Sequence, residues 1–280
     1  MSISVARGRG SGARSGAADR PLTARSVALS LLLGSHPDRM SPAALIRAGE
    51  HFGVPASTMR VALTRAVAAG ELRRTPAAGA SAGGSAAAVG PGAPDDYALG
   101  DRLLARQRRQ DEAVEDAETA WDGDWEMAVV VVSGRPGADR AALRDLLQRH
   151  RLAELREGVW TRPANLRRPA AYADDPVLAC FTARLAGEPG GPDAVGRDSV
   201  GLAASLWDLD GWAREGRGLL HDLGTTADPA RRLAVAARLV RHLTQDPLLP
   251  PPLRPAGWPG EELRRAYADY QAELRVLTAG

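Results

Sequence analysis

Residues 51–72, HFGVPASTMRVALTRAVAAGEL, contain the signals that decide the fold of the N-terminal part of the chain. Gly53 supplies a turn, and Pro55 prevents a preceding helix from continuing through it. Ser57 or Thr58 starts the next helix, which ends at Gly70. The stretch therefore predicts the turn and the second helix of a helix-turn-helix.

The two faces of this predicted helix differ in chemistry. Met59, Leu63 and Val67, with Ala62 and Ala66 beside them, repeat at helical spacing and predict a buried face. Arginine can pair with guanine through two hydrogen bonds, while hydroxyls and methyl groups can meet other base edges. The opposite face carries side chains suited to a DNA major groove: Ser57, Thr58, Arg60, Val61, Thr64 and Arg65.

The flanking residues complete a small DNA-binding domain. Residues 23–33 predict a helix with Thr23 as its N-cap, and residues 41–48 predict a second helix with Ser41 as cap and Pro42 at its first position. Residues 71–75, which include Arg73 and Arg74, and residues 97–100 predict two strands. The Ala/Gly-rich stretch between the strands cannot build a core. We predict a winged helix-turn-helix over residues 21–100 with a flexible wing at 76–95, and assign Arg73 and Arg74 to DNA contact.

Charge is distributed unevenly along the chain. All 36 basic residues are arginines, and they face 34 acidic residues. Residues 1–110 carry fifteen arginines and seven acids, an excess of eight positive charges, whereas residues 111–280 have an excess of six negative charges. The first part is therefore expected to be attracted to a polyanion. Part of this excess lies in residues 1–20, which we predict to be a disordered basic arm.

The rest of the chain predicts two further domains and an overall α+β fold. Residues 101–120 predict a charged linker helix. A strand–helix–strand–strand pattern over 121–170 predicts a small ferredoxin-like domain. The remainder, 171–280, predicts a helical regulatory and dimerisation domain. Its helices are expected at 175–185, 199–223, 228–245 and 260–278, with a proline-rich crossing before the last one anchored by Leu248, Leu249 and Trp258.

Several classes of function find no support in the sequence. The longest apolar run, around residues 127–132, is too short to cross a bilayer, and the first residues lack the apolar core of a secretion signal. The single cysteine, Cys180, is expected to be buried and structural, and the five histidines lack metal-ligand spacing. Phosphate-cradling and nucleophile motifs are missing. We therefore expect a cytoplasmic, non-enzymatic protein without metal or cofactor.

Four segments together resemble the PaaX family of bacterial transcriptional repressors. They are MRVALTRAVAAGEL (59–72), WDGDW (121–125), REGVWTRPANL (156–166) and DPLLPPPLRPAGWPGEELRRAYADYQAEL (246–274). The resemblance runs from about residue 25 to 274. It implies a winged helix, a central ferredoxin-like domain similar to small CRISPR-associated nucleases, and a C-terminal helical domain.

The resemblance also implies a homodimer on a double-stranded DNA operator of two-fold character, released by a small organic effector such as an acyl-coenzyme A. The best-known members repress phenylacetate-degradation genes and respond to phenylacetyl-coenzyme A. Arg60, Thr64 and Arg65 inherit the DNA role by position. The family's tryptophans are interpreted as core or interface anchors: Trp121, Trp125, Trp160 and Trp258. No effector residues can be assigned, because no ligand-specific motif matches.

Two alternatives remain open at this point. A metal-dependent nuclease would need an acid at the end of the first central strand, but residues 129–134 read VVVVSG, and Asp122 and Asp124 lie at the opposite edge. A protein-interaction module could use a winged helix without binding DNA. Salt dependence of binding distinguishes it, because arginines that contact phosphates release counterions.

Overall fold

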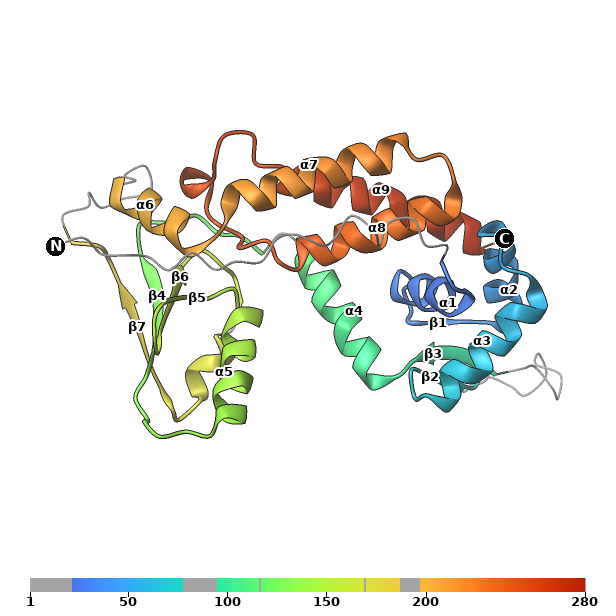
Figure 1. Ribbon diagram of the computed structural model, residues 1–280, viewed down its shortest axis with the longest axis horizontal. Coiled ribbons are helices and arrows are strands. Elements are labelled where there is room, and N and C mark those ends of the chain that lie inside the picture. The colour runs from blue at the N-terminus through green and yellow to red at the C-terminus, as the bar shows by residue number, and fades with distance from the viewer. Residues whose placement is uncertain (1–21, 78–94, 116, 169, 187–196, 280) are drawn as a thin grey trace, which may run out of the picture. The chain divides into compact units, whose positions relative to one another are not determined.

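The computed structural model describes residues 22–77, 95–115, 117–168, 170–186 and 197–279 (Figure 1). The expected basic arm (1–20) and most of the expected wing (76–95) lie outside the described residues. The chain forms two compact units, which we describe separately. The first comprises residues 1–100, 226–235 and 278–280, and the second comprises 101–225 and 236–277.

The first unit contains helices and strands in the order of a winged helix. These elements are α1 (Ala24–Leu33), β1 (Arg39–Met40), α2 (Pro42–His51), α3 (Ala56–Ala68), β2 (Leu72–Thr75) and β3 (Asp96–Leu99). The sheet is antiparallel, with β3 between β1 and β2. Two predicted boundaries differ: α2 continues three residues past Ala48, and α3 begins at Ala56 with Pro55, rather than Ser57 or Thr58, at its N-cap.

Local chemistry sets the boundaries of these helices. The hydroxyls of Thr23 and Ser41 accept hydrogen bonds of 3.1 Å from the backbone N–H groups of Ser26 and Ala44, so both predicted N-caps are confirmed. Gly53 and Gly70 have φ angles of 74° and 68°, which glycine adopts without steric cost. These turns fix how the chain enters and leaves α3.

Side chains from all three helices and the sheet form the core of the first unit. Gly49 lets α2 approach α3 closely, because a Cβ there would lie 2.4 Å from Cε of Met59. The predicted apolar stripe of α3 is buried, apart from Val67, which is only partly covered. The most completely buried side chains are Val27, Leu31, Leu32, Leu45, Met59, Leu63 and Leu99.

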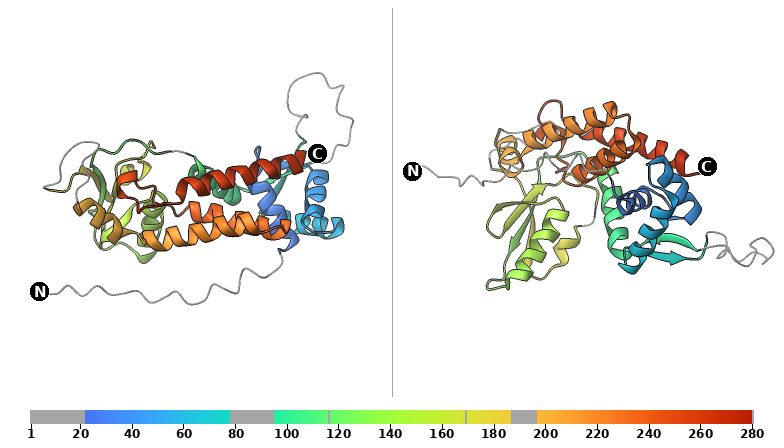
Figure 2. Two further views of the ribbon diagram at one scale, coloured as in Figure 1. Left: turned by 90° about the horizontal axis from the view of Figure 1, so that it is seen from above. Right: turned by 45° about the vertical axis from the view of Figure 1, so that its right-hand side comes forward.

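The second unit contains a four-stranded antiparallel sheet backed by a helix. Its elements are β4 (Trp125–Val130), α5 (Gly137–Arg149), β5 (Ala153–Arg156), β6 (Val159–Pro163), the 3₁₀ turn η1 (Ala171–Asp174) and β7 (Leu178–Ala183). The strand order is β5-β6-β4-β7. Leu143 and Leu147 of α5 pack on Ala128, Trp160 and Leu178 of the sheet. Figure 2 shows α5 along one face of the sheet.

The helix expected at residues 175–185 is wrong, because this segment contains β7. All six residues of β7 pair antiparallel with β4, from Leu178 opposite Val130 to Ala183 opposite Trp125. A six-residue apolar run is ambiguous between helix and strand when read alone. The free edge of β4 decides it, because unpaired backbone groups there gain partners. The sheet therefore extends past residue 170, the predicted end of the central domain.

Two other predicted helices are shorter than expected. The linker helix α4 (Asp101–Val114) ends before residue 117, where the chain becomes extended and Glu118 forms an isolated antiparallel bridge with Leu166. The helix expected over 199–223 is two helices, α6 (Arg197–Leu206) and α7 (Leu209–Thr225). Asp208 separates them, because its carboxylate accepts a 2.9 Å hydrogen bond from the N–H of Gly211 and caps α7.

Stacked aromatic rings join the C-terminal helices. These helices are α7, α8 (Pro229–Leu243) and α9 (Gly260–Ala279), with the 3₁₀ turn η2 (Pro251–Leu253) before α9. The Trp212 ring lies between His242 and Trp258, with ring centroids 4.4 Å and 4.3 Å apart. The proline-rich crossing is anchored as predicted, since Leu248 and Leu249 are buried and Trp258 packs on the cluster around Trp121 and Trp125. Among the described helices, none is long and apolar enough to cross a membrane.

Candidate nucleic-acid interface

The outward face of α3 carries the predicted DNA-contacting side chains. Because the buried stripe turns the helix against α1 and α2, the structure exposes all of Ser57, Thr58, Arg60, Val61, Thr64 and Arg65. Val61 is 49% exposed, a high value for a branched apolar side chain. An exposed valine between two arginines combines charged hydrogen-bond donors with a methyl surface.

The polar groups on this face differ in how far they are already engaged. The Thr64 hydroxyl donates a 3.0 Å hydrogen bond to the carbonyl of Arg60, which leaves its oxygen available as an acceptor. Within the described part of the chain, no hydrogen bond or ion pair engages the guanidinium groups of Arg60 and Arg65. These two groups can therefore bind an external anion or base edge without breaking an existing contact.

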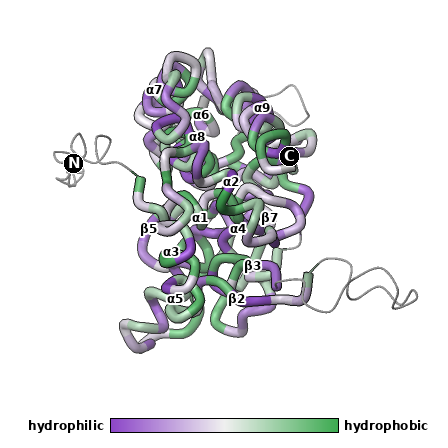
Figure 3. The backbone as a smooth tube through the Cα atoms, turned by 90° about the vertical axis from the view of Figure 1, so that its right-hand side faces the viewer, coloured by the Kyte–Doolittle hydropathy of each residue, from purple (hydrophilic) through white to green (hydrophobic). Residues whose placement is uncertain are grey.

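The two arginines of β2 are held in place by the neighbouring strand. The Nε–H of Arg73 donates to the Leu99 carbonyl at 3.0 Å, and its Nη2 lies 3.7 Å from Asp38. Nη2 of Arg74 is 3.4 Å from the Tyr97 hydroxyl, and its guanidinium lies 5.5 Å from the centre of the Tyr97 ring. β2 forms a hydrophilic stretch of the first unit (Figure 3).

Asp38 and Tyr97 were not predicted to matter for the interface, although both orient its arginines. Tyr97 pairs directly with Arg74 across the β2–β3 ladder. An aromatic residue next to an arginine-bearing strand is the signal that could have identified it. Asp38 has no comparable signal, because it lies in the loop before β1 and meets Arg73 only through the fold.

The turn after α3 is tied to α1. The guanidinium of Arg25 donates two hydrogen bonds to the Glu71 carboxylate, one of 2.7 Å from Nε and a second from Nη2. This fork-like pairing fixes geometry as well as charge. This ion pair connects α1 to the junction between α3 and β2. It therefore helps to hold α3 and β2, which carry the candidate arginines, in place relative to each other.

The acids considered for a nuclease site are engaged by an arginine. Arg184 donates to Asp124 at 2.8 Å and 2.7 Å and lies 3.8 Å from Asp122. The described residues contain no group of three or more potential metal ligands. Cys180 is exposed on the edge strand β7, which corrects the expectation of a buried cysteine. Local desolvation and the nearby Glu126 raise the pKa of its thiol, which disfavours the reactive thiolate.

Three family models match successive parts of the chain. They are the PaaX-like protein over residues 23–82, the PaaX protein central Cas2-like domain over 118–185, and the PaaX-like protein C-terminal domain over 210–279. A solved structure described as "Uncharacterized protein Rv0674 from Mycobacterium tuberculosis" is 41% identical, with a TM-score of 0.70, over 92% of this chain and 97% of that one. A comparison with curated proteins found no match.

These findings agree with the observed architecture. A winged helix, a Cas2-like sheet domain and a helical domain, in this order, are the domains of a family of transcriptional regulators. The chain belongs to the PaaX family. The resemblance and the α+β fold class inferred from the sequence are thereby confirmed.

Proposed function

We propose that this protein is a sequence-specific DNA-binding regulator that reads the major groove with α3. The observation that carries the proposal is the pair of unengaged guanidinium groups, Arg60 and Arg65, on either side of the exposed Val61. Arginine forms two hydrogen bonds to guanine, and an apolar side chain contacts the thymine methyl group. Arg73 and Arg74 on β2 are suited to phosphates beside the groove.

The proposed functional form is a homodimer. Two copies of α3 would enter successive major grooves about 34 Å apart, so the operator would contain two inverted half-sites. We assign dimerisation and regulation to the C-terminal helical domain. The support for this assignment is membership of the PaaX family and the domain order.

The proposed regulation is repression in the cytoplasm that is relieved by a small organic effector, such as an aryl-acyl-coenzyme A. An effector can relieve repression only if it binds the DNA-bound and free conformations with different affinity. Family membership alone supports this effector class. It is therefore tested separately from DNA binding.

The proposal is tested by selecting fragments of the source genome on the purified full-length protein, with and without phenylacetyl-coenzyme A. We expect enrichment of a palindromic site and its loss when the ligand is added. A variant carrying both Arg60→Ala and Arg65→Ala is the matched control and should select no site. Enrichment that ignores the ligand would retain the regulator and reject this effector. Absence of enrichment at low salt would reject DNA binding and favour a protein-interaction module.

A further inference from the structure

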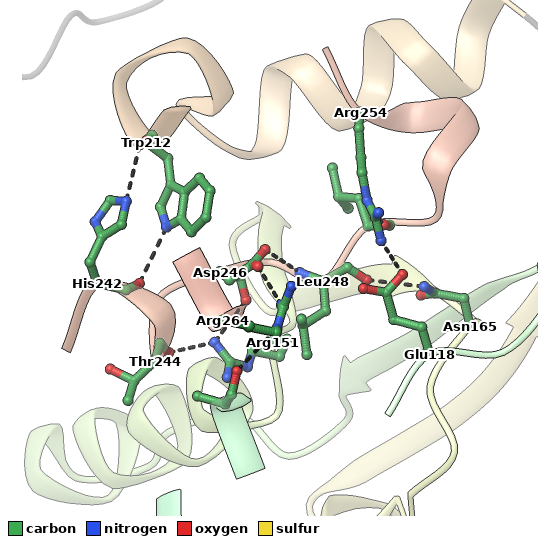
Figure 4. Close-up of polar contacts among 12 residues, drawn as sticks. Glu118, Arg151, Asn165, Trp212, His242, Thr244, Asp246, Leu248, Arg254 and Arg264 are labelled. Carbon is green, nitrogen blue, oxygen red and sulfur yellow. Dashed lines mark hydrogen bonds and ion pairs between the residues drawn. The ribbon is translucent and has the colours of Figure 1, made fainter. Parts of the chain in front are cut away.

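Arginine side chains gather inside the second unit, where the Cas2-like sheet domain meets the segment before α9. Arg162 lies at the end of β6, Arg168 lies in the chain that follows it, and Arg151 lies in the turn after α5. Arg264 of α9 reaches the same region (Figure 4). We refer to these four residues as the arginine cluster. Arg162 is completely buried, and the side chains of Arg168 and Arg264 are 21% and 16% exposed.

The cluster carries more positive than negative charge. In the described part of the chain, the carboxylates within ion-pair distance are Glu126 and Asp246. A third carboxylate, Glu112, lies beyond ion-pair distance but stabilises the charged forms of Arg151 and Arg168. Four guanidinium groups therefore face three carboxylates, an excess of one positive charge. His150 adds none at neutral pH, because burial and the nearby Arg168 and Arg149 lower its pKa to about 4. A buried charge without a partner is costly, so this excess favours a bound anion.

The carboxylates neutralise the cluster unequally. Asp246 accepts a 2.6 Å hydrogen bond from Arg264 and another of 2.9 Å from the N–H of Leu248. Glu126 instead accepts a 2.5 Å hydrogen bond from the Tyr172 hydroxyl and stays 4.0 Å from Arg162 and 3.9 Å from Arg168. Neither distance is a hydrogen bond. Glu126 therefore forms no hydrogen bond with either arginine.

Within the described residues, one donor of each arginine is buried and has no hydrogen-bond partner. Arg162 uses Nε on the Pro163 carbonyl and Nη2 on Asn165 and the Leu248 carbonyl, but its Nη1 has none. Arg168 uses both terminal nitrogens on His150, and its Nε has none. Buried polar atoms are almost always hydrogen-bonded in folded proteins. Two unpartnered donors in a cluster with excess positive charge indicate a missing acceptor.

Burial lowers the pKa of the arginines, as expected where no anion compensates their positive charge. Desolvation, with the neighbouring arginines, lowers the pKa of Arg162 to about 9, although Glu126 opposes the shift. The pKa of Arg151 falls to about 10 for the same main reason. An added anion would raise both values by stabilising the charged forms.

We propose that Arg162 and Arg168 form the base of a binding site for an oxyanion, the phosphate or carboxylate group of a small-molecule ligand. Arg168 is partly exposed and Arg162 is fully buried, so Arg162 would be the deeper of the two donors. This site rests on the proposed function in one respect, because the ligand is taken to be the effector. The anionic end of the effector would bind at this cluster.

The site is also positioned to transmit ligand binding between two parts of the second unit. Arg151 donates to the carbonyls of Thr244 and Asp246, and Asn165 donates to the carbonyl of Leu248 (Figure 4). Arg162 also donates to the carbonyl of Leu248. The sheet domain is therefore held to residues 244–248 in part by Arg162, one of the two guanidinium groups that would hold the anion. An anion that reorients Arg162 would weaken its contact with Leu248.

The test measures anion binding by the full-length protein without DNA, by calorimetric titration with potassium phosphate or potassium acetate against potassium chloride at equal ionic strength. The wild type should bind at least one of the two oxyanions saturably. Arg168→Gln should weaken this binding by about tenfold or more, because a charge-assisted hydrogen bond is lost. Arg254→Gln is the matched control. Arg254 is 22% exposed in the same region but is neutralised by Glu118, so its loss should leave binding unchanged.

Binding of phosphate alone would assign a phosphoryl group, binding of acetate alone a carboxylate, and binding of both a general oxyanion site. Absence of saturable binding by the wild type would overturn the site, as would wild-type binding by Arg168→Gln. Arg162→Met, checked for folding by circular dichroism, should also lose binding. If Arg162→Met does not fold, the anion binding measured for Arg168→Gln tests the site by itself. Anion binding without any DNA selection would refute the proposed function and keep the site.

Discussion

At the scale of the residue, the reading face of α3 depends on which side chains are already engaged. Arg73 and Arg74 are held by Asp38, Leu99 and Tyr97. Arg60 and Arg65 are held by nothing in the described chain. An arginine without a partner keeps its side-chain entropy until it binds, but its donors need not be released from another acceptor. Recognition of the bases is therefore expected to depend on α3. Affinity for DNA of any sequence is expected to depend on β2.

The first prediction concerns the two arginines of α3. Arg60→Ala or Arg65→Ala should each weaken binding to the selected operator by about 1–3 kcal/mol, the usual value of one two-hydrogen-bond contact to a base. Binding to random DNA should change much less. Fluorescence anisotropy at fixed salt measures both. The control is Arg214→Ala on the exposed side of α7, which removes the same charge. Operator binding at wild-type strength by both α3 variants would refute this reading face.

The second prediction concerns Val61. If its methyl groups contact thymine, Val61→Ala should weaken operator binding by up to about 1.6 kcal/mol, because it removes two carbons worth about 0.8 kcal/mol each when fully buried. Replacing the contacted thymine with deoxyuridine should weaken wild-type binding similarly and should have no further effect on the variant. Equal sensitivity of both proteins at every thymine would show that Val61 does not contact the base methyl group.

At the scale of the element, two close backbone contacts set the geometry of the winged helix. Gly49 lets α2 meet α3 at Met59. Gly100, directly after β3, donates a 2.7 Å hydrogen bond to the Glu71 carbonyl, and a Cβ there would lie 2.4 Å from the Gly70 carbonyl oxygen. The second contact is with backbone, which cannot move aside as a flexible side chain can.

The third prediction follows from this contact. Gly100→Ala should destabilise the protein by about 1–3 kcal/mol, the usual cost of overpacking. The matched substitution is Gly218→Ala in α7, where a Cβ would meet no atom within 4 Å. Because alanine is a better helix former than glycine, it should stabilise the protein by about 0.5–1 kcal/mol. Urea unfolding followed by circular dichroism measures both. Equal effects would show that the contact after β3 is not tight.

At the scale of the whole molecule, the charge separation sets the conditions for DNA binding. Residues 1–110 carry an excess of eight positive charges and residues 111–280 an excess of six negative charges. In the proposed complex with DNA, the acidic part is expected to limit non-specific attraction, and the basic part is expected to supply phosphate contacts. Association should therefore be strong only where the winged helix itself meets the duplex.

The fourth prediction is a steep salt dependence. If each copy of a homodimer contacts at least two phosphates, the slope of log K against log salt should be about −3.6 or steeper, since each phosphate contributes about −0.9. Titrations between 50 and 200 mM potassium chloride, about the range over which such effects are resolved, give this slope. Arg73→Ala should make it shallower by about one contact per copy. A slope near zero would contradict phosphate binding and support the protein-interaction alternative.

Much of the winged helix could be predicted because its signals are local. Thr23 and Ser41 cap the helices expected from them, and Gly53 and Gly70 make the turns expected of glycine. The face of α3 also follows from the spacing of Met59 and Leu63, because helical period and apolarity are properties of the segment itself. The roles of the exposed residues in DNA binding remain predictions.

The elements that were mispredicted depend on distant partners. β7 is a strand because β4 offers an unpaired edge, and nothing within residues 178–183 specifies that partner. Residues 117–119 leave the helical conformation because Glu118 and Thr119 meet the chain at residues 165–166, and Glu118 meets Arg254. Cys180 is exposed because it lies on an edge strand rather than in a helix.

The sequence by itself determined the winged helix, the exposed face of α3, the α+β class and membership of the PaaX family, because capping, periodicity and motif order depend on neighbouring residues. Only the tertiary structure decided which arginines are free and which are buried together. The chain has 36 arginines, and spacing does not distinguish Arg162 from the rest. Its burial beside Arg168, with unpartnered donors on both, arises from contacts between segments far apart in the chain, and the cost of that burial identifies it as a candidate ligand site.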